Sequence, residues 1–212
     1  MKKYELTTET LQFAGRTLHR IKAVKDFDSI KAGEFGGWIE NEKNLSQDDN
    51  AWIYGDAMVF DNAKIFGNAE VYGNANVSGN ANVSDYAKVY GNAGVYDYAN
   101  VSDYAKVYDN AEVYDYANVS DYAKVYGNAA IKGDAKVHDA VDYIVFKNFW
   151  SSGRYFTWTS SNNKWSVGCF YGTGEELIKK AYADSEKSGR EYERVVRYVE
   201  SILADEKKEK SN

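Results

Sequence analysis

Few residues of this chain have the types and spacing that catalysis requires. The 212 residues include only two histidines, His19 and His138, and one cysteine, Cys169. An imidazole can act as a general base and a cysteine thiolate as a nucleophile. The sequence contains no phosphate-binding glycine loop, no serine elbow and no zinc-ligand spacing of His and Cys. We therefore expect Cys169 to be a buried strand residue, and we expect no catalytic residue, no metal site, no cofactor and no enzyme.

A six-residue repeat positions many of the aromatic side chains. Alanine occupies every sixth position from Ala51 to Ala135, fifteen times in a row, and Val or Ile follows each alanine by two residues. A period of six fits neither an amphipathic helix nor a simple alternating strand. It predicts a short strand followed by a sharp turn, with three such units completing one triangular coil.

An eighteen-residue period supports the triangular coil. Residues 83–100 read VSDYAKVYGNAGVYDYAN and residues 101–118 read VSDYAKVYDNAEVYDYAN, so each of three faces keeps its identity between coils. We expect Val and Ile to point inward and Gly, Asn or Asp to form the corners, because these residues tolerate left-handed backbone. The chain contains no proline, which agrees with strands that must donate hydrogen bonds to the next coil.

The repeat resembles the hexapeptide left-handed parallel β-helix family, which is best known from acyltransferases. In that family an aliphatic residue is followed four positions later by a small one, as Val71 is by Ala75 and Val101 by Ala105. The chain departs from the family after the aliphatic residue, where Tyr or Ser replaces the usual Gly, Ala, Asp or Glu. The resemblance implies a left-handed parallel β-helix, here of about five triangular coils.

Composition and pattern divide the chain into four segments. Residues 1–50 contain short strands, and Ile39 and Leu45 already fall on the six-residue frame, so this segment is expected to cap the open end of the coil. Residues 51–140 carry 6 Lys/Arg and 12 Asp/Glu. Their net charge of −6 equals the net charge of the whole chain. The predicted fold class is mainly β, with these segments in order: an N-terminal β cap (1–50), the β-helix of fifteen hexapeptides (51–140), a three-stranded antiparallel sheet (141–172), and helices that break near Ser188-Gly189 and end in a charged tail (173–212).

The residue after each inward aliphatic residue is expected to point outward. On the first face these residues form a tyrosine ladder, and two more tyrosines lie on the second face. The candidate interface residues are Tyr54, Tyr72, Tyr90, Tyr108 and Tyr126 on the first face, with Tyr96 and Tyr114 on the second. Such a stripe can bind a partner protein or a second copy of the chain. The alternative is that stacked tyrosines only stabilise neighbouring coils.

A column of aspartates offers a weaker candidate site. Asp85, Asp103, Asp121 and Asp139 repeat one coil apart and could attract a cation. Metal sites need converging ligands, whereas these carboxylates are spread along an edge, so turn geometry is the favoured explanation.

The two ends of the chain are similar to uncharacterised phage and prophage β-helix proteins of gut bacteria. The similarity lies in the opening YELTTETLQFAGRTLHRIKAVKDF, in KAGEFGGWIENEKNLSQDDNAWIYGDA, and in the closing GRYFTWTSSNNKWSVGCFYGTGEELIKKAYADSEKSGREYERVVRYVESILADE. It implies a phage-associated accessory protein that acts inside a bacterial cell, and it supplies no activity or functional residues.

These observations predict a non-catalytic protein that acts by protein binding, as a homo-oligomer (dimer or trimer), with a host defence protein as a candidate target for inhibition. The alternatives are an acyltransferase-like enzyme with His138 at a subunit cleft and a structural component of a phage particle. No apolar run approaches the roughly 20 residues of a membrane span, and the N-terminus has no secretory signal. The sequence pI of about 5.1 disfavours direct nucleic-acid binding. We expect a cytoplasmic protein without membrane contact.

Overall fold

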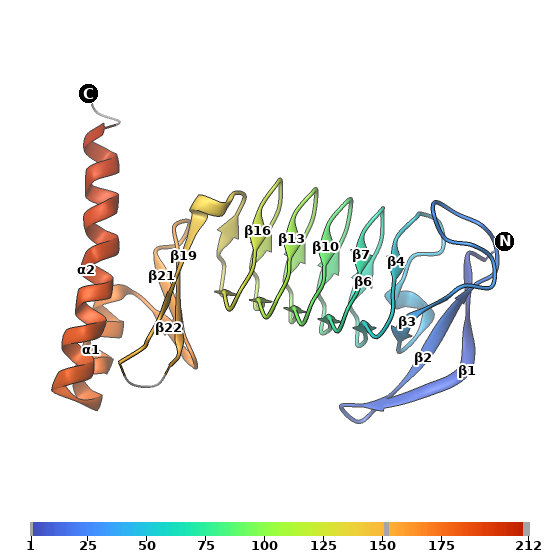
Figure 1. Cartoon of the computed structure of the whole chain (residues 1–212), viewed down its shortest axis with the longest axis horizontal. Coiled ribbons are helices and arrows are strands. Elements are labelled where there is room, and N and C mark those ends of the chain that lie inside the picture. The colour runs from blue at the N-terminus through green and yellow to red at the C-terminus, as the bar shows by residue number, and fades with distance from the viewer. Residues whose placement is uncertain (1, 151–152, 210–212) are drawn as a thin grey trace.

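A left-handed parallel β-helix forms the body of the protein (Figure 1). The computed structural model describes residues 2–150 and 153–209. Two-residue strands on three faces pair in parallel with the strand one coil later, so that Val89 lies opposite Val107 and Val107 opposite Val125. The eighteen-residue period is therefore the length of one coil, as the repeat predicts.

The strands of the β-helix form three sheets, one on each face of the prism. The sheet of the second face contains β5 (Met58–Val59), β8 (Asn76–Val77), β11 (Gly94–Val95), β14 (Glu112–Val113) and β17 (Ala130–Ile131). The sheet of the first face contains β4 (Trp52–Ile53), β7 (Glu70–Val71), β10 (Lys88–Val89), β13 (Lys106–Val107) and β16 (Lys124–Val125). The third contains β6 (Lys64–Ile65), β9 (Asn82–Val83), β12 (Asn100–Val101), β15 (Asn118–Val119) and β18 (Lys136–Val137).

The core consists of stacked aliphatic columns. Every inward Val or Ile of the repeat and every alanine two residues before it is buried. Backbone amides donate from coil to coil; for example, the amide of Lys88 donates to the carbonyl of Ala105 at 2.9 Å. A proline at a donor position would remove one such bond. The absence of proline and the fixed alanine frame thus have the same cause.

Glycine and aspartate form the corners. Gly67, Asp85 and Asp103 have φ angles of +71°, +58° and +56°, the left-handed region that most side chains avoid. The corner aspartates also connect coils, because the carboxylate of Asp103 accepts from the amide of Asp121 at 3.2 Å. This bonding explains the aspartate column without a cation. Among the described residues, no group of three His, Cys, Asp or Glu side chains could hold a metal ion.

The β-helix begins earlier than the sequence indicates. Strand β3 (Phe35–Ile39) pairs in parallel with β5, and Leu45 pairs in parallel with Ile65. Ile39 and Leu45 thus occupy Val/Ile positions, although by spacing they fall on the alanine frame. Eight residues instead of six separate Leu45 from Ile53, and this insertion shifts the frame by two. The structure therefore has about six coils, and the predicted number of about five is wrong.

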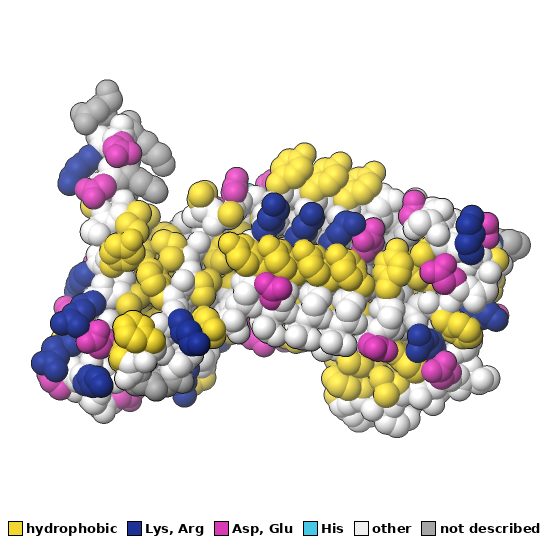
Figure 2. Space-filling view, viewed as in Figure 1, with side chains coloured by type: hydrophobic (Ala, Val, Ile, Leu, Met, Phe, Trp, Pro, Cys, Tyr) yellow, Lys and Arg dark blue, Asp and Glu magenta, His cyan; other side chains and the backbone are white. Residues whose placement is uncertain are grey.

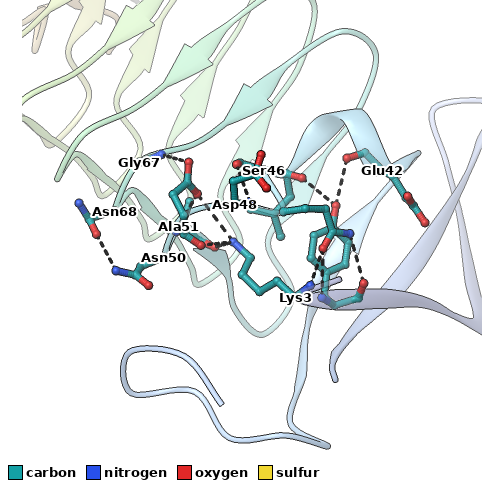
Figure 3. Close-up of polar contacts among 12 residues, drawn as sticks. Lys3, Glu42, Ser46, Asp48, Asn50, Ala51, Gly67 and Asn68 are labelled. Carbon is teal, nitrogen blue, oxygen red and sulfur yellow. Dashed lines mark hydrogen bonds and ion pairs between the residues drawn. The ribbon is translucent and has the colours of Figure 1, made fainter. Parts of the chain in front are cut away.

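The N-terminal segment caps the first coil. A hairpin of β1 (Tyr4–Phe13) and β2 (Arg16–Ala23) extends the sheet of the second face, because β2 pairs antiparallel with β3, which pairs with β5. Trp52 is buried beneath this cap, with the rings of Tyr4 and Phe27 edge-on to it at 6.2 and 5.3 Å. Polar contacts around Lys3 connect the start of the chain to the loop that follows the 3₁₀ turn of residues Glu42–Asn44 (Figure 3).

The C-terminal sheet has four strands where the sequence predicts three. After a 3₁₀ turn (Ala140–Asp142), the strands β19 (Tyr143–Lys147), β20 (Tyr155–Thr159), β21 (Lys164–Val167) and β22 (Phe170–Gly172) pair antiparallel in that order. The fourth strand arises because the chain reverses at Gly168, whose φ is +56°. Cys169 lies in this turn and is exposed, so the expectation that it is buried is wrong.

This sheet closes the far end of the prism. Tyr143 follows Val137 by six residues, takes the next inward position, and donates from its hydroxyl to the carbonyl of Lys124 at 2.9 Å. The hydroxyl of Thr157 accepts from the amide of Ala130 at 2.9 Å. Side chains of the sheet thus form hydrogen bonds with a backbone carbonyl and a backbone N–H group that an uncapped last coil would expose.

Two helices cover the opposite face of the sheet (Figure 1). Helix α1 (Gly174–Asp184) begins after the capping box of Thr173 and Glu176, and helix α2 (Glu186–Glu209) follows it. The break lies at Ser185, three residues before the predicted one. Neither helix is both long and apolar enough, over the residues described, to cross a bilayer. Part of the predicted charged tail, residues 210–212, lies outside the described residues.

Candidate functional site

The tyrosine ladder is present on the face of β4, β7, β10, β13 and β16. Its consecutive rings from Tyr72 to Tyr126 are stacked, with centroids 4.7, 4.9 and 5.3 Å apart and interplanar angles of at most 13°. At the N-terminal end, Tyr54 meets Tyr72 edge-on at 6.4 Å. Figure 2 shows this face as a continuous row of hydrophobic side chains along the coils. The role of the ladder as an interface stays a prediction.

The stacking determines what the ladder presents to solvent. Because the rings are parallel, each inner ring has both faces covered, and its edge and hydroxyl point outward. Burial, with a smaller effect from the neighbouring tyrosine, raises the pKa of Tyr90 and of Tyr108 above the ordinary value of 10. Tyr126, the last ring, is 48 % exposed, whereas Tyr72, Tyr90 and Tyr108 are only partly exposed. The open ring face of the ladder is therefore at Tyr126.

A row of lysines runs beside the ladder. Lys88, Lys106 and Lys124 precede the ladder tyrosines by two residues, and Figure 2 shows basic side chains between two hydrophobic rows. The Lys88 ammonium pairs with Glu70 at 2.8 Å. The second hydrophobic row contains the corner stack of Tyr86, Tyr104 and Tyr122, with centroids 5.0 and 5.2 Å apart.

The two tyrosines of the second face do not form a ladder. The hydroxyl of Tyr96 folds back over Gly94 and occupies the place that a Cβ would take there. The Lys132 ammonium lies over the ring of Tyr114, 5.0 Å from its centroid. It also lies 5.7 Å from the ring centroid of Tyr171 in the C-terminal sheet. Both predicted residues are thus engaged within the chain, and the structure does not join them to the first face.

His138 belongs to a cluster that the sequence reasoning missed. Its Nδ1 lies 2.9 Å from a carboxylate oxygen of Asp121 and 2.8 Å from the hydroxyl of Ser120. His138 follows β18, while Ser120 and Asp121 follow β15 one coil earlier. The eighteen-residue period could have revealed the pairing, because it places residue 138 directly beside residue 120.

The geometry of this cluster suits proton transfer. A tautomer with hydrogen on Nδ1 donates to the Asp121 carboxylate and leaves Nε2 without a proton, as a general base requires. The His138 side chain is 52 % exposed, so Nε2 is accessible from solvent. The other histidine, His19, lies in β2 with its Nδ1 3.4 Å from the carbonyl of Thr7 and has no carboxylate partner among the described residues.

No protein-family model matches the sequence. A segment of the chain is 39 % identical over 62 residues to a protein of Escherichia coli (strain K12) named "Uncharacterized acetyltransferase YdcK". The match covers 26 % of this chain and 19 % of that protein, so the chain spans about a fifth of the length of this curated relative. The coil and this relative support a hexapeptide-repeat β-helix family.

The comparison corrects one expectation. The sparse inventory of catalytic residues predicts that the chain is not an enzyme, whereas the relative is named as an acetyltransferase. This finding overturns the expectation that the chain is not an enzyme. A phage origin and a cytoplasmic location are not addressed by these findings, and both stay predictions.

Proposed function

We propose that the chain is an acyl-transfer enzyme in which His138 acts as the general base. The observation that carries the proposal is the contact between the His138 imidazole and the Asp121 carboxylate, 2.9 Å apart. A carboxylate on Nδ1 fixes the tautomer and stabilises the imidazolium that forms when Nε2 takes a proton. The relative named as an acetyltransferase supports the same reaction class.

The reaction uses an acyl thioester as donor and an alcohol or amine as acceptor. Nε2 of His138 takes the proton from the acceptor, and the acceptor oxygen or nitrogen attacks the carbonyl carbon of the thioester. The carbon–sulfur bond breaks, and the leaving thiolate takes the proton back from the imidazolium. The products are the acylated acceptor and a free thiol, and His138 returns to its starting state.

A second copy of the chain would complete this site. His138 lies on the outer surface of the last coil and is half exposed, while an acyl transfer gains from exclusion of water around the reacting groups. A homo-oligomer, dimer or trimer, would place another surface against His138. Light scattering on the purified protein measures this assembly directly.

The test is release of thiol from acetyl-coenzyme A in the presence of a panel of amines and alcohols. We expect His138→Ala to lower the rate by about 100-fold or more. Asp121→Asn should lower kcat with little change in KM and should alter the pH profile. His19→Ala is the matched control and should leave the rate unchanged. Absence of acetyl-coenzyme A binding by calorimetry, or equal rates for the wild type and His138→Ala, would overturn the proposal.

A second candidate function is protein binding through the tyrosine ladder. It is favoured by the exposed ring edges of Tyr90 and Tyr108 on a flat face, since aromatic side chains are enriched at interfaces. A host protein is one candidate partner, and inhibition of a host defence system stays a prediction. Tyr90→Arg with Tyr108→Arg should abolish self-association or partner capture, whereas unchanged binding by this variant refutes the role of the ladder.

A further inference from the structure

The tyrosine ladder ends at a hollow between the β-helix and the C-terminal sheet. The hollow has a volume of about 440 Å³, and its lining includes Tyr126, Asn128, Ala140, Tyr143 and Tyr155. Tyr108 covers one face of the Tyr126 ring at 5.3 Å. Tyr126 lines the hollow and is half exposed, so its other face is open on that side.

The hollow lies where the repeat would place the next ring. Eighteen residues after Tyr126 the chain has Ile144, an aliphatic residue that lines the hollow and also packs against the core between the C-terminal sheet and the helices. Eighteen residues after Tyr122, the last ring of the corner stack, it has Ala140. Two aromatic rows thus end at aliphatic side chains, and no protein ring stacks on the open face of Tyr126 among the described residues.

A planar ring is the ligand shape that fits this position. Stacking at the ladder spacing of about 5 Å, or closer, would bury both the ligand ring and the open face of Tyr126. Asn128 supplies an amide at the same level. It is the fourth member of a column in which Asn74 donates to Asn92, and Asn92 to Asn110, at 3.2 Å each. An amide side chain offers both a donor and an acceptor, which suits the edge of a nucleobase.

The charges around the hollow favour an anionic ligand. None of the residues that line it is acidic. The Lys147 ammonium lies 5.6 Å from the ring of Tyr155, which lines the hollow. Lys124 precedes Tyr126 by two residues and is exposed, and it has no ion-pair partner among the described side chains. Lys147 thus contacts the aromatic lining of the hollow and Lys124 precedes that lining in the chain, whereas the Asp109 carboxylate accepts from the amide of the lining residue Gly127 at 3.2 Å.

We propose that this hollow binds a nucleotide. The base stacks on Tyr126 and continues the ladder, Asn128 bonds to the edge of the base, and Lys124 and Lys147 neutralise the phosphates. The site does not depend on the proposed acyl transfer, because neither His138 nor Asp121 lines the hollow, although Ala140 of its lining follows His138 by two residues.

The test is calorimetric titration of the full-length protein with ADP, GDP, CDP and UDP, and with adenosine and inorganic phosphate as partial ligands. We expect at least one of the nucleoside diphosphates to bind. Tyr126→Ala should weaken binding about 10-fold or more, as loss of one base–aromatic stack does. Tyr126→Trp should retain binding, which separates loss of stacking from loss of the fold. Tyr72→Ala, at the first stacked ring of the ladder and three coils away from Tyr126, is the matched control and should bind like the wild type.

Substitution of the two lysines tests their proposed interaction with the phosphates. Lys124→Ala with Lys147→Ala should weaken nucleotide binding and leave adenosine binding unchanged. His138→Ala should bind nucleotides like the wild type, so that failure of the acyl-transfer proposal and failure of this one give different results. The proposal is overturned if no nucleoside diphosphate binds at millimolar concentration, if Tyr126→Ala binds as well as the wild type, or if inorganic phosphate binds as tightly as the nucleotides.

Discussion

The buried Lys3 makes the stability of the protein depend on pH in a direction that can be measured. Its side chain is 1 % exposed, and its ammonium donates to the carbonyls of Asp49 and Ala51 at 2.8 Å each (Figure 3). The carboxylate of Asp49 is 3.8 Å away. Burial is the largest cause that lowers the pKa of Lys3 from 10.5 to about 8, and the attraction of Asp49 opposes it only in part.

The sign follows from the two pKa values. The folded protein releases the Lys3 proton more readily than the unfolded chain does, so the unfolded state binds more protons between about pH 8 and 10.5. The free energy of unfolding therefore rises with pH through this window. The full shift corresponds to about 3 kcal/mol, because one pKa unit is worth about 1.4 kcal/mol. Between about pH 7 and pH 9, linkage gives a gain of about 1 kcal/mol.

Urea unfolding followed by circular dichroism measures the effect. The titration should stay below about pH 9.5, because burial raises the pKa of Tyr4 and the loss of that contribution at higher pH would oppose the gain. Lys3→Met removes the titrating group and keeps most of the buried aliphatic chain, so the rise should disappear. Lys2→Met is the matched control, since Lys2 is 60 % exposed, and it should show the wild-type rise.

Two results would refute the reasoning. In the first, the free energy of unfolding of the wild type is constant or falls between about pH 7 and pH 9. This would show that the charge of Lys3 does not destabilise the folded protein. A rise of the same size in Lys3→Met would assign the effect to another group. Either result would mean that the carbonyls and the Asp49 carboxylate compensate the ammonium for its burial.

Three further predictions concern the coils and their C-terminal end. Gly67→Ala should destabilise the protein by more than about 2 kcal/mol, because a Cβ there would lie 2.8 Å from the backbone of the next coil. Gly55→Ala, with a similar φ of +59° and open space around it, should cost only about 1 kcal/mol in the same denaturant titration. Val107→Ala should lower the free energy of unfolding by about 2 kcal/mol, whereas substitutions of exposed side chains should change it by no more than about 0.5 kcal/mol. Equal effects of the two kinds of substitution would contradict tight packing of the inward Val and Ile columns. Burial raises the pKa of Tyr143 to about 12. The neutral Tyr143 hydroxyl therefore contributes fully to stability below about pH 10, and this contribution is lost as pH rises towards 12. In an ultraviolet titration, Tyr143→Phe should lack one tyrosine that ionises late in the wild type.

The β-helix was predictable from the sequence because every six-residue unit has the same residue types at the same positions. Inward Val, corner Ala and left-handed Gly or Asp recur at fixed spacing, so the faces and the tyrosine ladder follow directly. The first coil was missed because the two-residue insertion before Ile53 places Ile39 and Leu45 on the alanine frame. Spacing alone does not reveal such a shift when the earlier units lack the alanine.

The candidate sites were predictable only in part. The ladder follows from the repeat, but the engagement of Tyr96 with Gly94 depends on a side-chain conformation that no spacing encodes. The contact of His138 with Asp121 joins residues of two coils, and it was overlooked because the two residues are seventeen apart and fall in different columns of the repeat. The hollow at Tyr126 depends on how the C-terminal sheet meets the last coil, which the repeat does not describe.

The near identity of neighbouring coils has a consequence for the lengths that such a chain can adopt. Residues 83–100 and 101–118 differ at only two positions, so either segment could be deleted or duplicated while each coil still meets a neighbour of the same kind. Both terminal structures would remain intact, since the described contacts of each lie near its own end of the β-helix, such as Phe13 with Phe60 and Thr157 with Ala130. Natural variants should therefore differ in steps of eighteen residues, and each step should change the separation of the two ends by about 4.8 Å.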